Sequence, residues 1–140
     1  MESKYGLCPE CNKPNTDDDW CQQCNAKRFQ QDFHKWTSGN KFIDEFIQES
    51  QLNAEDSLVI LERIPYNRLT NVEYLDKGGF STVYKSIWLD GHIIKWDYEN
   101  QQWSRNDNWN VVLKNLDNSS TLNDEFLNEV IILFFIFFSY

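Results

Sequence analysis

The hydrophobic and polar positions divide the chain into segments of different periodicity. Residues 1–28 are polar and rich in Pro, Asn and Asp, which favour turns over regular elements. Beyond them, apolar residues recur at i, i+4 and i+7 over residues 29–36, as in an amphipathic helix, and at i, i+1, i+4 and i+5 over 42–47. The Ser38-Gly39-Asn40 break between the two stripes predicts two short helices.

The pattern changes after a third apolar segment, residues 58–64, which stops at Pro65. Proline lacks an N–H and fixes φ, so it ends a helix or begins an extended stretch. Residues 72–89 are rich in Val, Ile, Thr, Tyr and Trp and are interrupted by Gly78-Gly79, which predicts two strands joined by a tight turn.

Aromatic and polar residues alternate over 92–109, after a turn signal at Asp90-Gly91, and predict an irregular hairpin or surface flap leading into a strand at 110–115. A capping-box pattern at Thr121 then predicts a helix. The following run, which begins at Val130, is almost wholly apolar, but it is roughly half the 20 or so residues that a bilayer crossing needs. We therefore expect no membrane span.

Composition narrows the classes of function. A chain of 140 residues has room for one ordinary domain, or for a small module plus part of a larger one. With 22 acidic and 13 basic side chains, the net charge of -9 would repel a phosphate backbone, so we expect no nucleic-acid partner. The N-terminus lacks a signal-peptide pattern, which favours a reducing, cytoplasmic location.

The cysteines form two CxxC pairs, Cys8 with Cys11 and Cys21 with Cys24, separated by nine residues. Each pair can supply two of the four thiolates of a Zn²⁺ tetrahedron, so the spacing predicts a closed structural zinc site. Redox pairs would call for a βαβ context that is absent, and a cytosolic address disfavours disulfides. We expect Trp20 to pack over the cluster. The pattern predicts a metal and leaves the task of the module open.

Three further segments occur in an informative order: LDKGGFSTVYK at 75–85, VVLK at 111–114 and EFLNEV at 125–130. A nucleotide site needs backbone close to phosphates, a cation that reaches them and an anion that holds the cation. Together the three segments resemble the glycine-rich loop, the lysine strand and the following helix of the protein kinase N-terminal lobe, closest to the tyrosine-kinase-like branch. The resemblance covers about 60 residues.

The resemblance implies an ATP site in which Lys114 holds the α- and β-phosphates, Glu129 pairs with that lysine and Val83 covers the adenine. The full set that it implies is Leu75, Gly78, Gly79, Phe80, Val83, Lys114 and Glu129. Three features depart from the family pattern: Asp76 in the first glycine position, Ser81 in the third, and the long aromatic insert before the lysine strand.

No HRD, DFG or APE sequence is present, so we expect no catalytic residues and no magnesium ligands. The predicted fold is α+β, with a Cys₄ module at 1–28, a helical segment at 29–65, a partial kinase lobe at 66–130 and an apolar tail at 131–140. The predicted function is a truncated protein kinase domain that carries the ATP-binding glycine loop, lysine and helix glutamate but lacks the catalytic lobe. Its predicted cofactors are zinc and ATP, and whether this chain still binds ATP stays open.

Two alternatives stay open. In the first, the chain is an adaptor whose zinc module and helices contact a protein partner, and residues 1–65 should then fold and bind alone. In the second it is a nucleotide-sensing pseudokinase, which requires Lys114 and Glu129 to pair. A zinc-ribbon nucleic-acid binder is disfavoured by the acidic charge.

Overall fold

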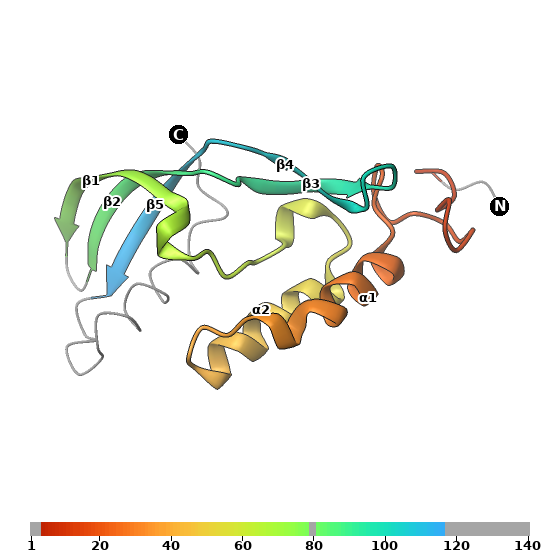
Figure 1. Ribbon diagram of the computed structural model, residues 1–140, viewed down its shortest axis with the longest axis horizontal. Helices are drawn as coiled ribbons and strands as arrows, with labels where there is room; N and C mark the ends of the chain where they lie inside the picture. The colour runs from red at the N-terminus through yellow and green to blue at the C-terminus, as the bar shows by residue number, and fades with distance from the viewer. Residues whose placement is uncertain (1–3, 79–80, 117–140) are drawn as a thin grey trace.

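Two helices lie beneath a layer of antiparallel strands (Figure 1). This arrangement comes from a computed structural model, which describes residues 4–78 and 81–116. The cysteine-rich N-terminal segment lies at one end of the molecule and the larger sheet at the other. In the described ranges, no helix combines the length and the apolar character needed to cross a bilayer.

Both predicted helices are present, but the first begins seven residues before the predicted range of 29–36, inside the segment predicted to form turns. Helix α1 (Gln22–Asp32) continues into a 3-10 turn (Phe33–Lys35), and α2 (Lys41–Asn53) begins after Asn40, whose side chain accepts hydrogen bonds from two backbone N–H groups of the first turn. The apolar stripes are only partly buried, because Phe42 and Phe46 of α2 are 80% and 61% exposed whereas Ile47 is fully buried.

The larger sheet contains the two strands predicted around the glycine pair. Its order is β1-β2-β5, with β1 spanning Leu69–Gly78, β2 Ser81–Trp88 and β5 Trp109–Leu116, and both pairings are antiparallel. Its inner face contributes Leu69, Trp88, Val111 and Leu113 to a buried cluster that also contains Ile64. The other face of the larger sheet points away from the two helices (Figure 1).

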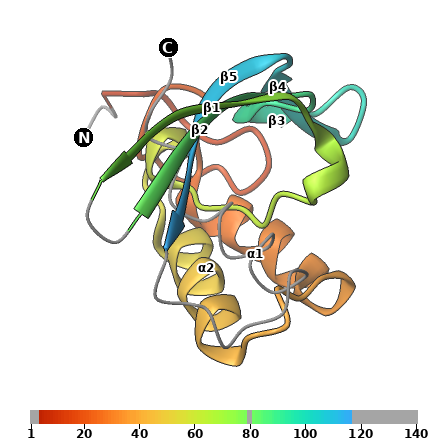
Figure 2. The same ribbon diagram turned by 90° about the vertical axis from the view of Figure 1, so that its left-hand side faces the viewer.

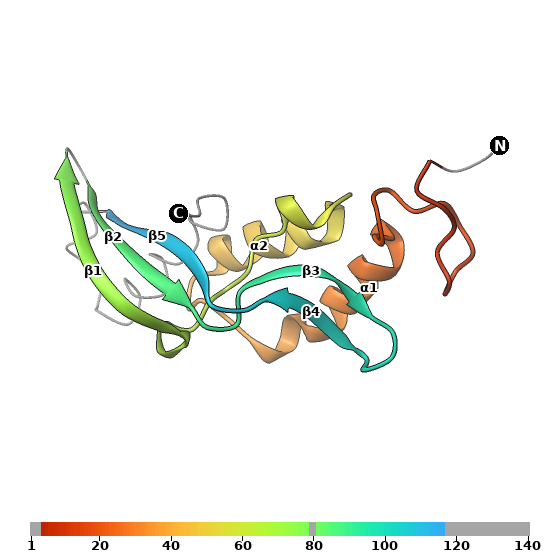
Figure 3. The same cartoon turned by 90° about the horizontal axis from the view of Figure 1, so that it is seen from above.

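The aromatic insert forms a second sheet of its own, the hairpin of β3 (His92–Asp97) and β4 (Gln102–Asn106). Figure 3 shows this hairpin extending from the larger sheet over α1 toward the N-terminal segment, and Figure 2 shows it above the helices. The expectation of a hairpin is confirmed, but a loose surface flap is not what forms, because Ile93 is fully buried and Trp103 packs in the same cluster.

The segment before Pro65 connects the cores. It forms a 3-10 turn at Ser57–Val59 and is then extended, as the proline allows. Ile60 lies in the core shared by α1 and the hairpin, Leu61 packs with α2, and Ile64 lies beneath the larger sheet. The molecule is therefore α+β, with a four-cysteine cluster near the N-terminus, as the sequence predicts.

Candidate functional site

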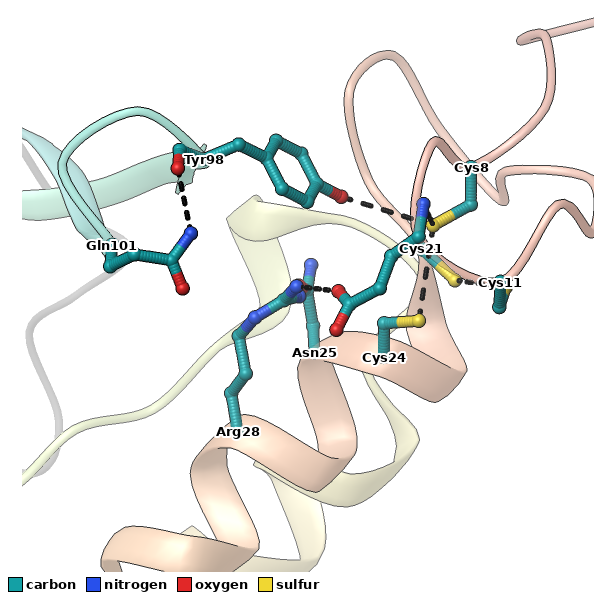
Figure 4. A network of polar contacts seen from close by, with 9 residues as sticks. Cys8, Cys11, Cys21, Cys24, Asn25, Arg28, Tyr98 and Gln101 are labelled. Carbon is teal, nitrogen blue, oxygen red and sulfur yellow. Dashed lines mark hydrogen bonds and ion pairs between the residues drawn. The ribbon is translucent and has the colours of Figure 1, made fainter.

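Four cysteine sulfurs gather at the N-terminal end of the molecule (Figure 4). All lie within 4.8 Å of one another, with Sγ–Sγ distances of 3.8 Å between Cys8 and Cys24 and 3.7 Å between Cys11 and Cys21. A tetrahedral zinc ion with Zn–S bonds near 2.3 Å requires about 3.8 Å between its sulfur ligands. The thiols are free. The four cysteines therefore have the ligand type and spacing to hold a zinc ion.

Local backbone geometry produces each pair of ligands. In the first CxxC turn, the backbone N–H of Glu10 points at the sulfur of Cys8, with a nitrogen–sulfur distance of 3.4 Å. The second pair opens α1, because Cys21 is its N-cap residue and Cys24 lies in its first turn. The free N–H groups and the dipole at a helix N-terminus stabilise negative charge, which offsets part of the cost of burying thiolates there.

The four thiols differ in acidity. Burial would raise the pKa of Cys8, but hydrogen bonds from backbone N–H groups and from the Tyr98 hydroxyl, 3.8 Å from the sulfur, lower it to about 6. Burial raises the pKa values of Cys21 and Cys24, and for Cys24 the neighbouring thiols add to that effect. Four close thiolates are thus unfavourable by themselves, and a cation is needed to hold them all deprotonated.

Arg28 lies beside the cysteine cluster and joins α1 to the hairpin. Its guanidinium donates to Oδ1 of Asn25 at 2.6 Å and pairs with Glu10 of the first CxxC turn. The same group lies over two rings of β3 and the hairpin turn, 4.6 Å from the centroid of Trp96 and 5.4 Å from that of Tyr98. This one side chain therefore contacts both the cysteine-rich segment and the insert.

An aromatic stack fixes the hairpin on the helix. The ring of Trp103 is stacked 4.6 Å from Phe29 and 5.8 Å from Trp20, and Trp96 meets it edge-on at 5.0 Å. Trp20 is 1% exposed, and its indole N–H donates to the carbonyl of Ala54 at 3.0 Å. The role of Trp20 is therefore to pack the cysteine-rich segment against α2 and the hairpin.

The predicted nucleotide residues fall on neighbouring strands of the larger sheet. Gly78 ends β1 opposite Ser81 of β2. Val83 of β2 is the register partner of Asp76 on one side and of Lys114 on the other, so these three positions form one row across the sheet. The insert does not disturb this register, because it folds away as a separate hairpin.

Leu75 lines a shallow cavity of about 400 Å³ on the face of β1 and β2 that points away from the core. Ile87, Lys85 and Glu73 also line it, and the last two form an ion pair with 3.1 Å between nitrogen and oxygen. Gly79, Phe80 and Glu129, which complete the predicted set, lie outside the described residues.

Comparison of the chain with known protein families, curated proteins and solved structures found no match.

Sequence reasoning did not identify Tyr98 or Arg28 as neighbours of the cysteines. Tyr98 is separated from Cys8 by 90 residues, so no local spacing links them. The sequence feature that points toward these contacts is the concentration of aromatic residues in the insert, because large aromatic side chains tend to pack against another part of the protein.

Proposed function

We propose that this chain is a kinase-like nucleotide-binding polypeptide whose N-terminal segment is stabilised by one zinc ion. Cys8, Cys11, Cys21 and Cys24 would hold the zinc, which supplies folding energy to a segment that has few apolar residues of its own. β1, β2 and β5 would form the phosphate-binding half of an ATP site. The sequence contains neither an HRD nor a DFG motif, so the proposal is limited to binding.

The observation that carries the nucleotide proposal is the pairing of β2 with β5. These strands pair continuously from Ser81–Leu116 to Trp88–Trp109, although the whole hairpin insert separates them in sequence. The glycine hairpin and the Lys114 position are thereby neighbours on one sheet, which is the arrangement that the kinase resemblance implies. Leu75, but not Val83, lines a cavity on that sheet.

ATP-Mg²⁺ binding, measured by calorimetry on the zinc-loaded protein, tests this proposal. We expect saturable binding that weakens at least about tenfold in Lys114→Ala, because the phosphates lose their cation. Lys41→Ala is the matched control, since it removes the same charge from an exposed side chain on α2, and it should bind as the wild type does. Absence of binding in the wild type, or equal losses in both variants, would contradict the proposal.

The adaptor alternative receives less support. It requires residues 1–65 to form an independent module, yet the core of that module includes Ile93 and Trp103 from the hairpin. The aromatic surface of α1 is thus already covered by the chain itself.

A further inference from the structure

The phenol of Tyr98 reaches the cysteine cluster from a distant segment of the chain. Its oxygen lies 3.8 Å from the sulfur of Cys8, which is fully buried, while the tyrosine itself remains 43% exposed. Figure 4 shows the ring pointing from the hairpin turn directly at the cysteines. The contact is therefore directed at a sulfur rather than at solvent.

The hairpin turn is built to hold Tyr98 in this position. Asp97 accepts hydrogen bonds at its Oδ1 from the backbone N–H groups of Glu99 (3.0 Å) and Asn100 (3.1 Å), which closes the turn. Gln101 then donates from its side chain to the carbonyl of Tyr98 at 2.6 Å. The backbone of the tyrosine is thus fixed by hydrogen bonds from both sides of the turn.

The hairpin as a whole is fixed to α1 near the cysteines. Trp103 of β4 stacks on Phe29, and the Arg28 guanidinium lies over the rings of Trp96 and Tyr98. Phe29 and Arg28 follow Cys24 within α1, so the helix that presents two of the sulfurs also carries the contacts that hold the tyrosine.

We propose that Tyr98 is a positioning residue of the metal site, whose hydroxyl donates a hydrogen bond to the metal-bound thiolate of Cys8. The inference rests on the proposed zinc binding. A metal-bound cysteine carries no proton, so the direction of this hydrogen bond is fixed, with the phenol as donor. Four thiolates around Zn²⁺ leave a net charge of about -2, and donors in the surrounding layer reduce its cost.

A consequence is that metal binding and hairpin docking stabilise each other. In the sequence the hairpin lies between β2 and β5. The coupling between metal binding and hairpin docking therefore extends from the cysteine cluster to the strands that carry Val83 and Lys114.

The test compares zinc affinity in the full chain and in Tyr98→Phe, measured by competition with a chromophoric chelator. We expect one zinc per wild-type chain and about tenfold weaker binding in the variant, the size of effect typical for a lost hydrogen bond to a ligand. Tyr66→Phe, at a half-exposed ring beside Pro65, is the matched control and should bind as the wild type does.

Cobalt substitution separates a bond to the thiolate from general support of the fold. A thiolate that lacks a hydrogen bond is a better electron donor, so the sulfur-to-cobalt charge-transfer band of Tyr98→Phe should move to lower energy. Unchanged affinity, equal losses in both variants, or weaker binding without the spectral shift would overturn the role of Tyr98. Absence of metal binding in the wild type would instead overturn the zinc proposal itself.

Discussion

At the scale of single residues, burial changes the acidity of one histidine. His92 begins β3, directly after the turn that leaves the larger sheet, and is only 6% exposed. Its Nε2 lies 2.6 Å from the carbonyl of Ser57, so a neutral ring with its proton on Nε2 satisfies that carbonyl. Burial lowers the pKa of His92, although the Ser57 hydrogen bond and the charge of Glu62 oppose that shift.

This lowered pKa predicts a loss of stability in acid. Between the unfolded pKa near 6.5 and the lower folded pKa, the unfolded chain binds more protons, so the free energy of unfolding falls as the pH drops through that window. Urea unfolding at pH 7.5 and pH 5 should show a smaller pH dependence in His92→Gln, which keeps a donor for Ser57 and does not titrate.

His34→Gln, a change at an exposed histidine, is the control and should keep the wild-type pH dependence. If His92→Gln and the wild type lose stability equally on acidification, the buried histidine does not contribute to the effect.

The residues around the four-cysteine cluster show what spacing can and cannot predict. The two CxxC pairs identify all four sulfurs, because a ligand pair on one turn is a local feature of the sequence. Tyr98 depends on how a hairpin docks on α1, which is set by contacts between distant segments. The spacing of residues along the chain does not reveal such contacts, so the position of Tyr98 beside Cys8 could not be predicted from it.

At the scale of elements, the connection between the two sheets depends on one glycine. Gly91 has a φ of +76° between β2 and β3, a region that side chains disfavour. A Cβ at this position would lie 1.5 Å from the carbonyl oxygen of Asn106, on the opposite strand of the hairpin. The backbones of the turn and of β4 approach too closely for any other residue.

Gly91→Ala should therefore destabilise the protein by at least about 2 kcal/mol, since it combines the cost of positive φ with a backbone clash. Gly6→Ala is a matched control, because Gly6 has the same φ of +76° but open space around it. Thermal unfolding followed by circular dichroism should show a clearly larger drop in melting temperature for Gly91→Ala. Equal drops would mean that the clash is relieved by movement of β4.

The elements themselves were largely predictable, and the departures have physical causes. The helical periodicity over 29–36 and 42–47 and the glycine pair in a β-rich run identified α1, α2, β1 and β2. Periodicity predicted a helix that starts at residue 29, whereas α1 starts at Gln22, because its first turn is polar apart from Cys24 and has no apolar pattern. It also overstated the buried face of α2, where Phe42 is exposed.

At the scale of the whole molecule, one extended segment joins the separate cores. Ile60, Leu61 and Ile64 are each at least 94% buried, and each belongs to a different cluster. Two side chains of α2 bind the backbone of this segment. Gln51 donates to the carbonyl of Leu61 at 2.9 Å, and the hydroxyl of Ser50 accepts from the N–H of Leu61 at 3.2 Å. The N-terminal half and the larger sheet thus share their packing.

Shared packing predicts that residues 1–65 do not fold alone. Without the hairpin, Trp20, Phe29 and Ile60 lose Trp103 and Ile93, and deleting a buried aromatic residue alone costs about 3–5 kcal/mol. That loss is comparable to the 5–15 kcal/mol that stabilises a typical domain. Zinc-loaded residues 1–65 should therefore show a weak near-ultraviolet circular dichroism signal and a broad thermal transition, whereas the full chain should melt cooperatively.

Unfolding of shortened chains decides whether the N-terminal half depends on the hairpin or is the independent module of the adaptor alternative. A chain of residues 1–108 restores the hairpin while omitting β5, and it should recover the tryptophan signal that residues 1–65 lack, because Trp103 again covers Phe29. If residues 1–65 instead melt as sharply as the full chain, then the zinc segment and helices are a self-sufficient module. The hairpin would then not be needed for the N-terminal half to fold, and the adaptor alternative would gain the independent module that it requires.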